Sequence, residues 1–200
     1  MITRPPYGLG LAATLALQAA VIGWMVWDRA ELIRSGAEVR LTVQPVDPRD
    51  LFRGDYVVLN YDISTLRPTL LAGEDAFERN DRIFVVLERS EEIWRPAAIH
   101  SRYPTPRAGQ VVLAGRVAEV AEEWPFPTGE TGPACPFPCP ALIVLYGIES
   151  YFVPEGAGRD IEQLRDTGKV ELVAAVGSGG RAAIKGLIVD GTLLYEEPLY

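Results

Sequence analysis

From residue 46 to residue 61 the chain reads Val-Asp-Pro-Arg-Asp-Leu-Phe-Arg-Gly-Asp-Tyr-Val-Val-Leu-Asn-Tyr, a polar turn that runs directly into a strand. Pro48 fixes one backbone torsion, and aspartates beside it can accept hydrogen bonds from neighbouring amides, as is typical of turns. Gly54 tolerates the positive φ that many turns need. From residue 55 to residue 64, side chains alternate, with one face formed by Val57, Leu59, Tyr61 and Ile63. This alternation predicts a half-buried strand.

The same signal recurs along the chain and predicts a mostly β domain. Residues 37–46 also alternate, and the further strand candidates are 81–87, 93–100, 110–120, 142–149, 170–176, 182–189 and 192–196. Asp190-Gly191 supplies a tight-turn dipeptide between the last two candidates. Short helices are expected at residues 72–79 and 159–167, the second followed by Gly168 as a stop. The expected fold is a β-rich sandwich or barrel-like domain with one or two short helices.

The amino-terminal segment carries no charged residue from Pro5 to Trp27. About twenty helical residues, rising about 1.5 Å each, span a hydrocarbon core about 30 Å thick. Trp24 and Trp27 lie at one end, where indole rings favour the membrane interface, and Arg4 precedes the segment. A cleaved signal peptide would have a shorter apolar region and a cleavage site just after it, whereas the first candidate site here lies at residues 35–37. A helix packed on a soluble core would carry a polar stripe, which this segment lacks. The sequence therefore predicts an uncleaved transmembrane signal-anchor.

Length and composition set the expected organisation. The chain has 200 residues, 48% of them hydrophobic, which is enough for one domain with its own core. We expect residues 1–36 to form a cytoplasmic stub, the anchor and a linker, and residues 37–200 to form an extracytoplasmic β-rich domain. The net charge of −8 and the lack of a basic cluster argue against nucleic acid as a partner.

Two cysteines, Cys135 and Cys139, lie in a proline-rich stretch at residues 124–140 that we expect to be an exposed loop. In an oxidising compartment they could close a small disulfide ring, and two independent thiols are the alternative. His100 is the only other classical soft ligand, and it is expected to be structural. No metal site and no cofactor is predicted.

Side chains capable of binding concentrate at the turn and at residues 146–156. Arginine presents a flat fork of donors suited to carboxylate or phosphate, and tyrosines can stack on sugar or peptide. If these groups converge at one mouth of the sheet, they would bind a polar ligand or partner. In the structural alternative, the acids pair with arginines and the tyrosines fill the edge of a core. The candidate binding residues are Asp47, Arg49, Asp50, Arg53, Gly54, Asp55, Tyr56, Tyr61, Tyr146, Glu149 and Tyr151.

The turn also resembles the signature of the bacterial family named for its Gly-Asp-Tyr-x-x-Leu-x-Tyr motif. The motif reads here Gly54, Asp55, Tyr56, Leu59 and Tyr61. The segments 146–156 and 180–191 resemble the family as well, so the resemblance runs from about Val39 to Tyr195. It implies a bacterial, membrane-anchored module of unassigned activity, suspected of working beside multi-spanning membrane proteins.

An enzyme is the main alternative, because Leu51, Gly54 and Asp55 also resemble a fragment of type I signal peptidases. A Ser-Lys hydrolase needs both members within hydrogen-bond reach. No serine lies between Ser35 and Ser64, and the only lysines are Lys169 and Lys185. Asp47 and Asp50 could in principle divide acid and base roles in a carboxylate-dependent hydrolase.

We therefore predict a non-catalytic binding or accessory module in the bacterial inner membrane. It would cross the membrane once, with the amino terminus in the cytoplasm and the main domain in the periplasm. Its partner would be a multi-spanning membrane protein or another envelope component. A signal-peptidase-like or carboxylate-dependent hydrolase is the alternative function.

Overall fold

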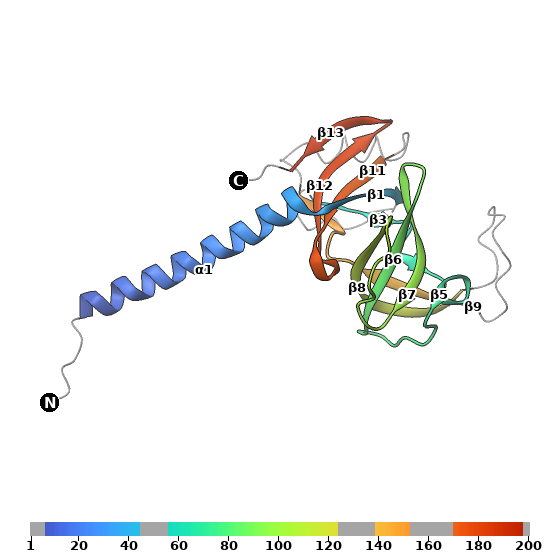
Figure 1. The fold of residues 1–200 in the computed structure, drawn as a ribbon, viewed down its shortest axis with the longest axis horizontal. Coiled ribbons are helices and arrows are strands. Elements are labelled where there is room, and N and C mark those ends of the chain that lie inside the picture. Colours follow the sequence, from blue (N-terminus) through green and yellow to red (C-terminus); the bar gives the residue numbers. More distant parts are fainter. Residues whose placement is uncertain (1–6, 45–55, 124–138, 153–169, 198–200) are drawn as a thin grey trace.

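A computed structural model describes residues 7–44, 56–123, 139–152 and 170–197, and the fold is mostly β, as predicted (Figure 1). One long helix, α1 (Tyr7–Ser35), projects from the β-domain. The 26 residues Gly10–Ser35 contain a window with a mean hydropathy of 1.6, none of it buried inside the protein. By length and composition this helix could cross a membrane, since 26 residues rise about 39 Å.

A five-stranded antiparallel sheet lies next to the end of α1. Its first strand in sequence, β1 (Ala37–Gln44), is separated from the helix by Gly36 alone. The strand order is β13 (Thr192–Glu196), β12 (Ala182–Val189), β11 (Val170–Val176), β1 (Ala37–Gln44) and β3 (Asn60–Tyr61). The turn between β12 and β13 uses the predicted dipeptide, because Asp190 and Gly191 both have positive φ, 47° and 78°. The turn between β11 and β12 contains a short 3₁₀ segment, η2 (Ser178–Gly180).

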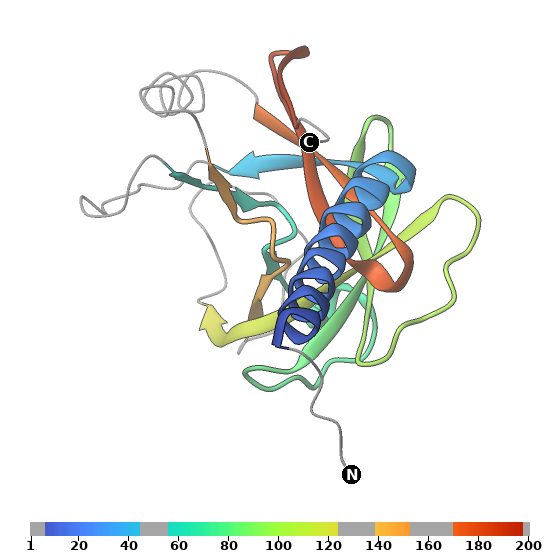
Figure 2. The ribbon, with the colours of Figure 1, turned by 90° about the vertical axis from the view of Figure 1, so that its left-hand side faces the viewer.

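A six-stranded sheet forms the other half of the domain (Figure 2). Its pairs are antiparallel except for β5 (Ala72–Gly73) and β7 (Ile93–His100), which are parallel. A two-stranded ribbon pairs β2 (Tyr56–Val58) with β10 (Ser150–Phe152). The order in the large sheet is β4 (Thr65–Leu66), β9 (Cys139–Leu145), β8 (Gln110–Glu123), β6 (Arg82–Ser90), β7 (Ile93–His100) and β5 (Ala72–Gly73), and a 3₁₀ segment, η1 (Pro68–Leu70), lies between β4 and β5.

The two larger sheets share one hydrophobic core. On β1 the buried side chains are Val39, Leu41 and Val43, which is the face that the alternation predicted. Both sheets contribute to the same cluster of buried residues, which includes Leu172 and Ala174 from β11 and Ile83, Val85, Leu113 and Val144 from the large sheet. Burial of apolar surface from both sheets is the main term that holds the domain together.

Several local predictions need correction or lie outside the described residues. The helix predicted at residues 72–79 is wrong: residues 72–73 form β5, and the Glu74 N–H donates to the Ile99 carbonyl at 3.0 Å instead of entering a helical turn. The strand predicted over residues 55–64 is divided into β2 and β3. The loop predicted for 124–140 is described only at its end, where residues 139 and 140 begin β9 rather than belonging to a loop. The helix predicted at 159–167 lies outside the described residues.

Candidate functional site

Many of the predicted binding residues lie outside the described part of the chain. Tyr56 and Tyr151 are placed in the paired strands β2 and β10, but only through their backbone. Of the two cysteines proposed for a disulfide, Cys135 lies outside the described residues, and Cys139 is placed only through its backbone at the start of β9. The disulfide therefore stays a prediction. The other candidates outside the described residues are Asp47, Arg49, Asp50, Arg53, Gly54 and Asp55.

Tyr61, the last residue of the family motif, lies in the core with 1% of its surface exposed. Its hydroxyl donates a hydrogen bond to the Ile148 carbonyl. Its own N–H donates to Ser64 Oγ at 3.0 Å, and the Ser64 N–H donates to the Tyr61 carbonyl at 2.8 Å. The polar groups at this turn are therefore paired with each other, which a buried turn requires.

Tyr146 makes the corresponding hydrogen bond in the opposite direction, from the segment after β9 to the turn after β3. It is buried, with 6% exposed, and its hydroxyl donates to the Ile63 carbonyl at 2.6 Å. Two tyrosines thus cross-connect two turns, one after β3 and one after β9. Their hydroxyls are occupied inside the domain, which gives both residues a structural role. The binding role predicted for them stays a prediction.

Glu149 closes the turn that follows β9. Its carboxylate accepts hydrogen bonds from the N–H groups of Tyr146 and Gly147, the second at 2.9 Å. Gly147 has a φ of 79°, a conformation that favours glycine. The Glu149 carbonyl accepts from the Leu59 N–H at 2.7 Å, so this turn is joined to the motif strand as well. Tyr61, Tyr146 and Glu149 therefore lie together around contacts inside the domain, and the structure does not test the binding role predicted for them. We call these three residues the Tyr-Glu cluster.

Burial raises the pKa of Tyr61 and of Tyr146, and the negative charge of Glu149 raises both further. Both phenols are therefore held protonated in the folded protein, which suits their role as hydrogen-bond donors to carbonyl groups. A phenol held in this way is a poor general base at neutral pH, because a base must give up its proton near the working pH.

Replacing Glu149 with alanine is expected to lower the free energy of unfolding by about 1–3 kcal/mol, because two N–H groups, one on a buried residue, lose their acceptor. Glu149→Gln keeps one acceptor oxygen and should lose less. Denaturant unfolding of the full chain in detergent micelles measures both. The matched control is Glu119→Ala, at an exposed position on β8, with an expected change within about 0.5 kcal/mol. Equal losses in Glu149→Ala and Glu119→Ala would contradict the capping role of Glu149.

The junction between α1 and the β-domain is a second feature, which the sequence analysis missed. In the last turns of the helix, Leu32 and Ile33 are buried, with 8% and 5% exposed, and they form an apolar cluster with Ala183 of β12. A Cβ on Gly36 would lie 2.6 Å from the Leu32 carbonyl oxygen and 3.0 Å from the Val176 nitrogen of β11, so glycine allows the close approach of the helix end and this strand. A signal was present, because two adjacent apolar residues interrupt the charged stretch 28–36.

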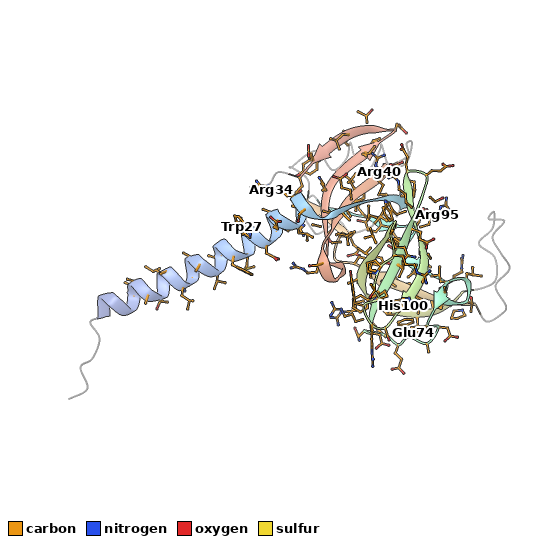
Figure 3. All side chains as sticks on the ribbon, in the orientation of Figure 1. Trp27, Arg34, Arg40, Glu74, Arg95 and His100 are labelled. Atoms are coloured by element: carbon orange, nitrogen blue, oxygen red, sulfur yellow. The ribbon has the colours of Figure 1, made fainter. Side chains whose placement is uncertain are left out.

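An ion pair crosses the same junction. The Arg181 guanidinium donates to both carboxylate oxygens of Asp28, at 2.7 and 3.0 Å. The two residues are 153 positions apart in the chain, so nothing in either local sequence predicts the pair. Helix and domain are thus joined by apolar packing and by a two-pronged ion pair, and they are not connected by an independent linker. Figure 3 shows Trp27 and Arg34 on the part of α1 nearest the domain.

A polar cluster lies at the end of the domain away from α1, where Figure 3 labels Glu74 and His100 close together. Glu74 Oε1 accepts hydrogen bonds from Ser101 Oγ at 3.0 Å and from the Ser101 N–H at 3.2 Å. These two hydrogen bonds hold the pKa of the Glu74 carboxyl below its usual range, and the nearby charges of His100 and Arg102 act in the same direction. The contacts join the segment after β5 to the end of β7.

Ser64, the serine that ends the serine-free stretch, and Lys185 both have partners inside the domain. Ser64 is buried, and its Oγ accepts from the Tyr61 N–H. Lys185 Nζ donates to Glu38 Oε1 at 2.6 Å across β12 and β1. Lys169 lies outside the described residues. Within the described ranges, no group of three or more His, Cys, Asp or Glu residues is placed to hold a metal ion.

Comparison with known proteins identifies the family. No curated protein and no solved structure matches the chain. A family model described as the GDYXXLXY protein matches residues 18–187. The match includes the end of α1, the motif, the Tyr-Glu cluster and most of the strands, and it spans far more than half of the 200 residues. The chain therefore belongs to the GDYXXLXY protein family.

Proposed function

We propose that this protein is a single-pass bacterial inner-membrane protein whose β-domain is a non-catalytic accessory module on the extracytoplasmic side. Helix α1 would cross the bilayer, with the amino terminus in the cytoplasm. The β-domain would contact a multi-spanning membrane protein or another envelope component at the membrane surface. The predicted Asp/Arg/Tyr turn would supply part of that contact.

One observation carries the proposal: the apolar part of α1 makes no contact that buries it, whereas the last turns of the same helix pack against the β-domain. Its large apolar side chains are exposed, for example Leu17 at 66% and Trp24 at 71%, whereas Leu32 and Ile33 are buried. Exposed apolar surface of this extent marks a site of membrane or protein contact. Because Leu32 and Ile33 pack on Ala183 of β12, cleavage at the candidate site, residues 35–37, would remove the helix side of the packed junction. An uncleaved anchor accounts for both halves of the helix.

The proposed orientation depends on more than the basic residues. Arg4 precedes the apolar segment, but Arg29 and Arg34 follow it, and basic residues near the ends of the span bias orientation. The two closely spaced cysteines fit an oxidising compartment. An amino-terminal anchor followed by a large carboxy-terminal domain is the usual arrangement of a protein exported through an uncleaved signal-anchor. The cysteines and the order of anchor and domain favour an extracytoplasmic domain, whereas the basic residues do not distinguish the two orientations in its favour.

Leu15→Arg combined with Leu17→Arg is expected to release the protein from membranes. Each arginine near the centre of a spanning helix costs about 2.5–3.5 kcal/mol of insertion free energy. Wild-type protein should stay in the membrane pellet after alkaline carbonate extraction, and the double variant should shift to the supernatant. The matched control is Leu193→Arg with Leu194→Arg, two exposed leucines of β13. The anchor proposal fails if wild-type protein is extracted as readily as the Leu15/Leu17 variant.

The orientation is tested with protease. Protease added to spheroplasts should digest the β-domain; protection until the cells are lysed would place the domain in the cytoplasm.

The partner is tested by affinity purification. Purification from detergent-solubilised membranes should recover a membrane or envelope protein with the wild type. Asp50→Asn with Asp55→Asn should reduce that recovery, and Asp75→Asn, at an exposed position after β5, should not. Recovery of no specific protein with the wild type would contradict the accessory role.

A further inference from the structure

A pocket of about 500 Å³ lies between the last turns of α1 and the β-domain. From the helix it is lined by residues that include Trp24, Met25 and Arg29, and from the domain by Tyr146, Arg181 and Ala182. The domain side is formed by the start of β12 and by the turn of the Tyr-Glu cluster. Figure 1 shows the turn between β11 and β12 beside the end of α1. A volume of this size is in the range of small-molecule sites, about 300–1,000 Å³, whereas protein partners bind over broad surfaces.

The pocket changes character along the helix. Trp24 and Met25 are large, apolar and exposed, at 71% and 65%. Arg29 comes five residues after Trp24, which is about 7.5 Å along the helix axis. If α1 spans a membrane, as proposed above, the apolar end of the pocket faces the acyl chains and the charged end lies at the headgroups. Tryptophan is the residue that most favours this boundary.

The charged end carries a net positive charge. Arg181 uses two of its donors on Asp28, and a guanidinium has five N–H donors in all, so three remain. Arg29 has no ion-pair partner within the described ranges. Two arginines and one aspartate therefore leave one uncompensated positive charge at the mouth of the pocket, which suits a phosphate group.

We propose that this pocket binds one anionic phospholipid from the outer half of the membrane in which α1 is anchored. Its phosphate lies at Arg29 and Arg181, and the upper part of an acyl chain lies along Trp24 and Met25. The bound lipid fills the space between helix and domain and so holds the domain at one orientation to the membrane surface. This inference rests on the proposed membrane anchor.

The test is native mass spectrometry of the full chain in mild detergent with phosphatidylglycerol or phosphatidylcholine of identical acyl chains. Wild-type protein should retain one phosphatidylglycerol in preference to phosphatidylcholine. Arg29→Gln should weaken that retention about fivefold, the effect of one basic residue at an anionic membrane surface. The matched control is Arg34→Gln, which removes the same charge from an exposed position of the same helix outside the pocket. It should retain the lipid as the wild type does.

Three results would overturn the proposal. Equal retention of the two lipids by wild-type protein would mean that the pocket does not select the anionic headgroup. Equal weakening in Arg29→Gln and Arg34→Gln would mean that general attraction, not the pocket, holds the lipid. Displacement of phosphatidylglycerol by inorganic phosphate would assign the site to a free anion. Carbonate extraction separates this proposal from the anchor, because protein that remains in the pellet without lipid preference disproves the lipid site alone.

Discussion

Tyr61→Ala is expected to lower the free energy of unfolding by about 3–5 kcal/mol, the range for removing a large aromatic side chain from a core. Tyr61 is 1% exposed, so alanine would leave a cavity between the two sheets. It would also leave the Ile148 carbonyl without the hydroxyl that now donates to it. Denaturant unfolding of the full chain in detergent micelles measures the loss.

Tyr61→Phe separates the hydroxyl from the ring. It should cost about 1–3 kcal/mol, because a buried carbonyl is left without a donor while the apolar packing is kept. The matched control is Tyr103→Phe, at a residue that is 43% exposed and packs edge-to-face on Phe84. Its expected change is within about 0.5 kcal/mol. If Tyr61→Phe behaves like Tyr103→Phe, the hydroxyl contributes nothing and the packing alone explains the position.

These values also bear on the meaning of the family motif. Leu59 and Tyr61 are both 1% exposed, so at least these two motif residues act in the interior. Their strand is joined by hydrogen bonds to the segment around Glu149, the second segment that resembles the family. The two stretches thus meet in one buried cluster. The binding role predicted for the turn before Tyr56, and for Tyr56 and Tyr151, stays a prediction, because their side chains lie outside what the structure describes.

Most strands could be predicted from sequence because the sheets bury one face of each strand. The predicted limits of β7, β11, β12 and β13 agree with the structure to the residue. Prediction failed where partners far away in sequence decide the backbone. The segment 72–79 contains acids and two alanines that suit a helix, but its first two residues pair in parallel with β7 and start no helix. The strand at residues 55–64 is divided because its parts pair with different strands, β2 with β10 and β3 with β1.

The candidate site was predictable only in part. Tyrosine has an apolar ring and a polar hydroxyl. The alternation therefore groups Tyr61 and Tyr146 with the apolar residues of their own segments, but it does not show which groups their hydroxyls contact. Both structural and binding interpretations fit the same spacing. The junction of Asp28 with Arg181 depends on the three-dimensional path of the chain, and no local pattern contains it. The pocket beside this ion pair is lined by residues far apart in the chain, so it could not be predicted from the sequence.

The paired tyrosines also predict an unusually steep loss of stability in alkali. Burial first, and the charge of Glu149 second, raise the pKa of Tyr61 and Tyr146 in the folded protein. In the unfolded chain both phenols ionise with a pKa near 10. Above about pH 10 the unfolded state therefore binds fewer protons than the folded state, and the free energy of unfolding falls as the pH rises. The contribution is complete below about pH 10 and is lost progressively from there toward the raised folded-state values.

The expected slope is about 1.4 kcal/mol per pH unit for each tyrosine, or about 2.7 kcal/mol for the pair. Denaturant unfolding at several values between about pH 9 and pH 12 measures it, and tyrosinate absorbance should show these two phenols ionising only as the chain unfolds. The double variant Tyr61→Phe with Tyr146→Phe should be less stable at neutral pH but should lose the extra alkaline slope. Tyr103→Phe should keep that slope, since its ring is exposed. An unchanged slope in the double variant would mean that other groups cause the alkaline unfolding and that the two phenols are not held protonated by the core.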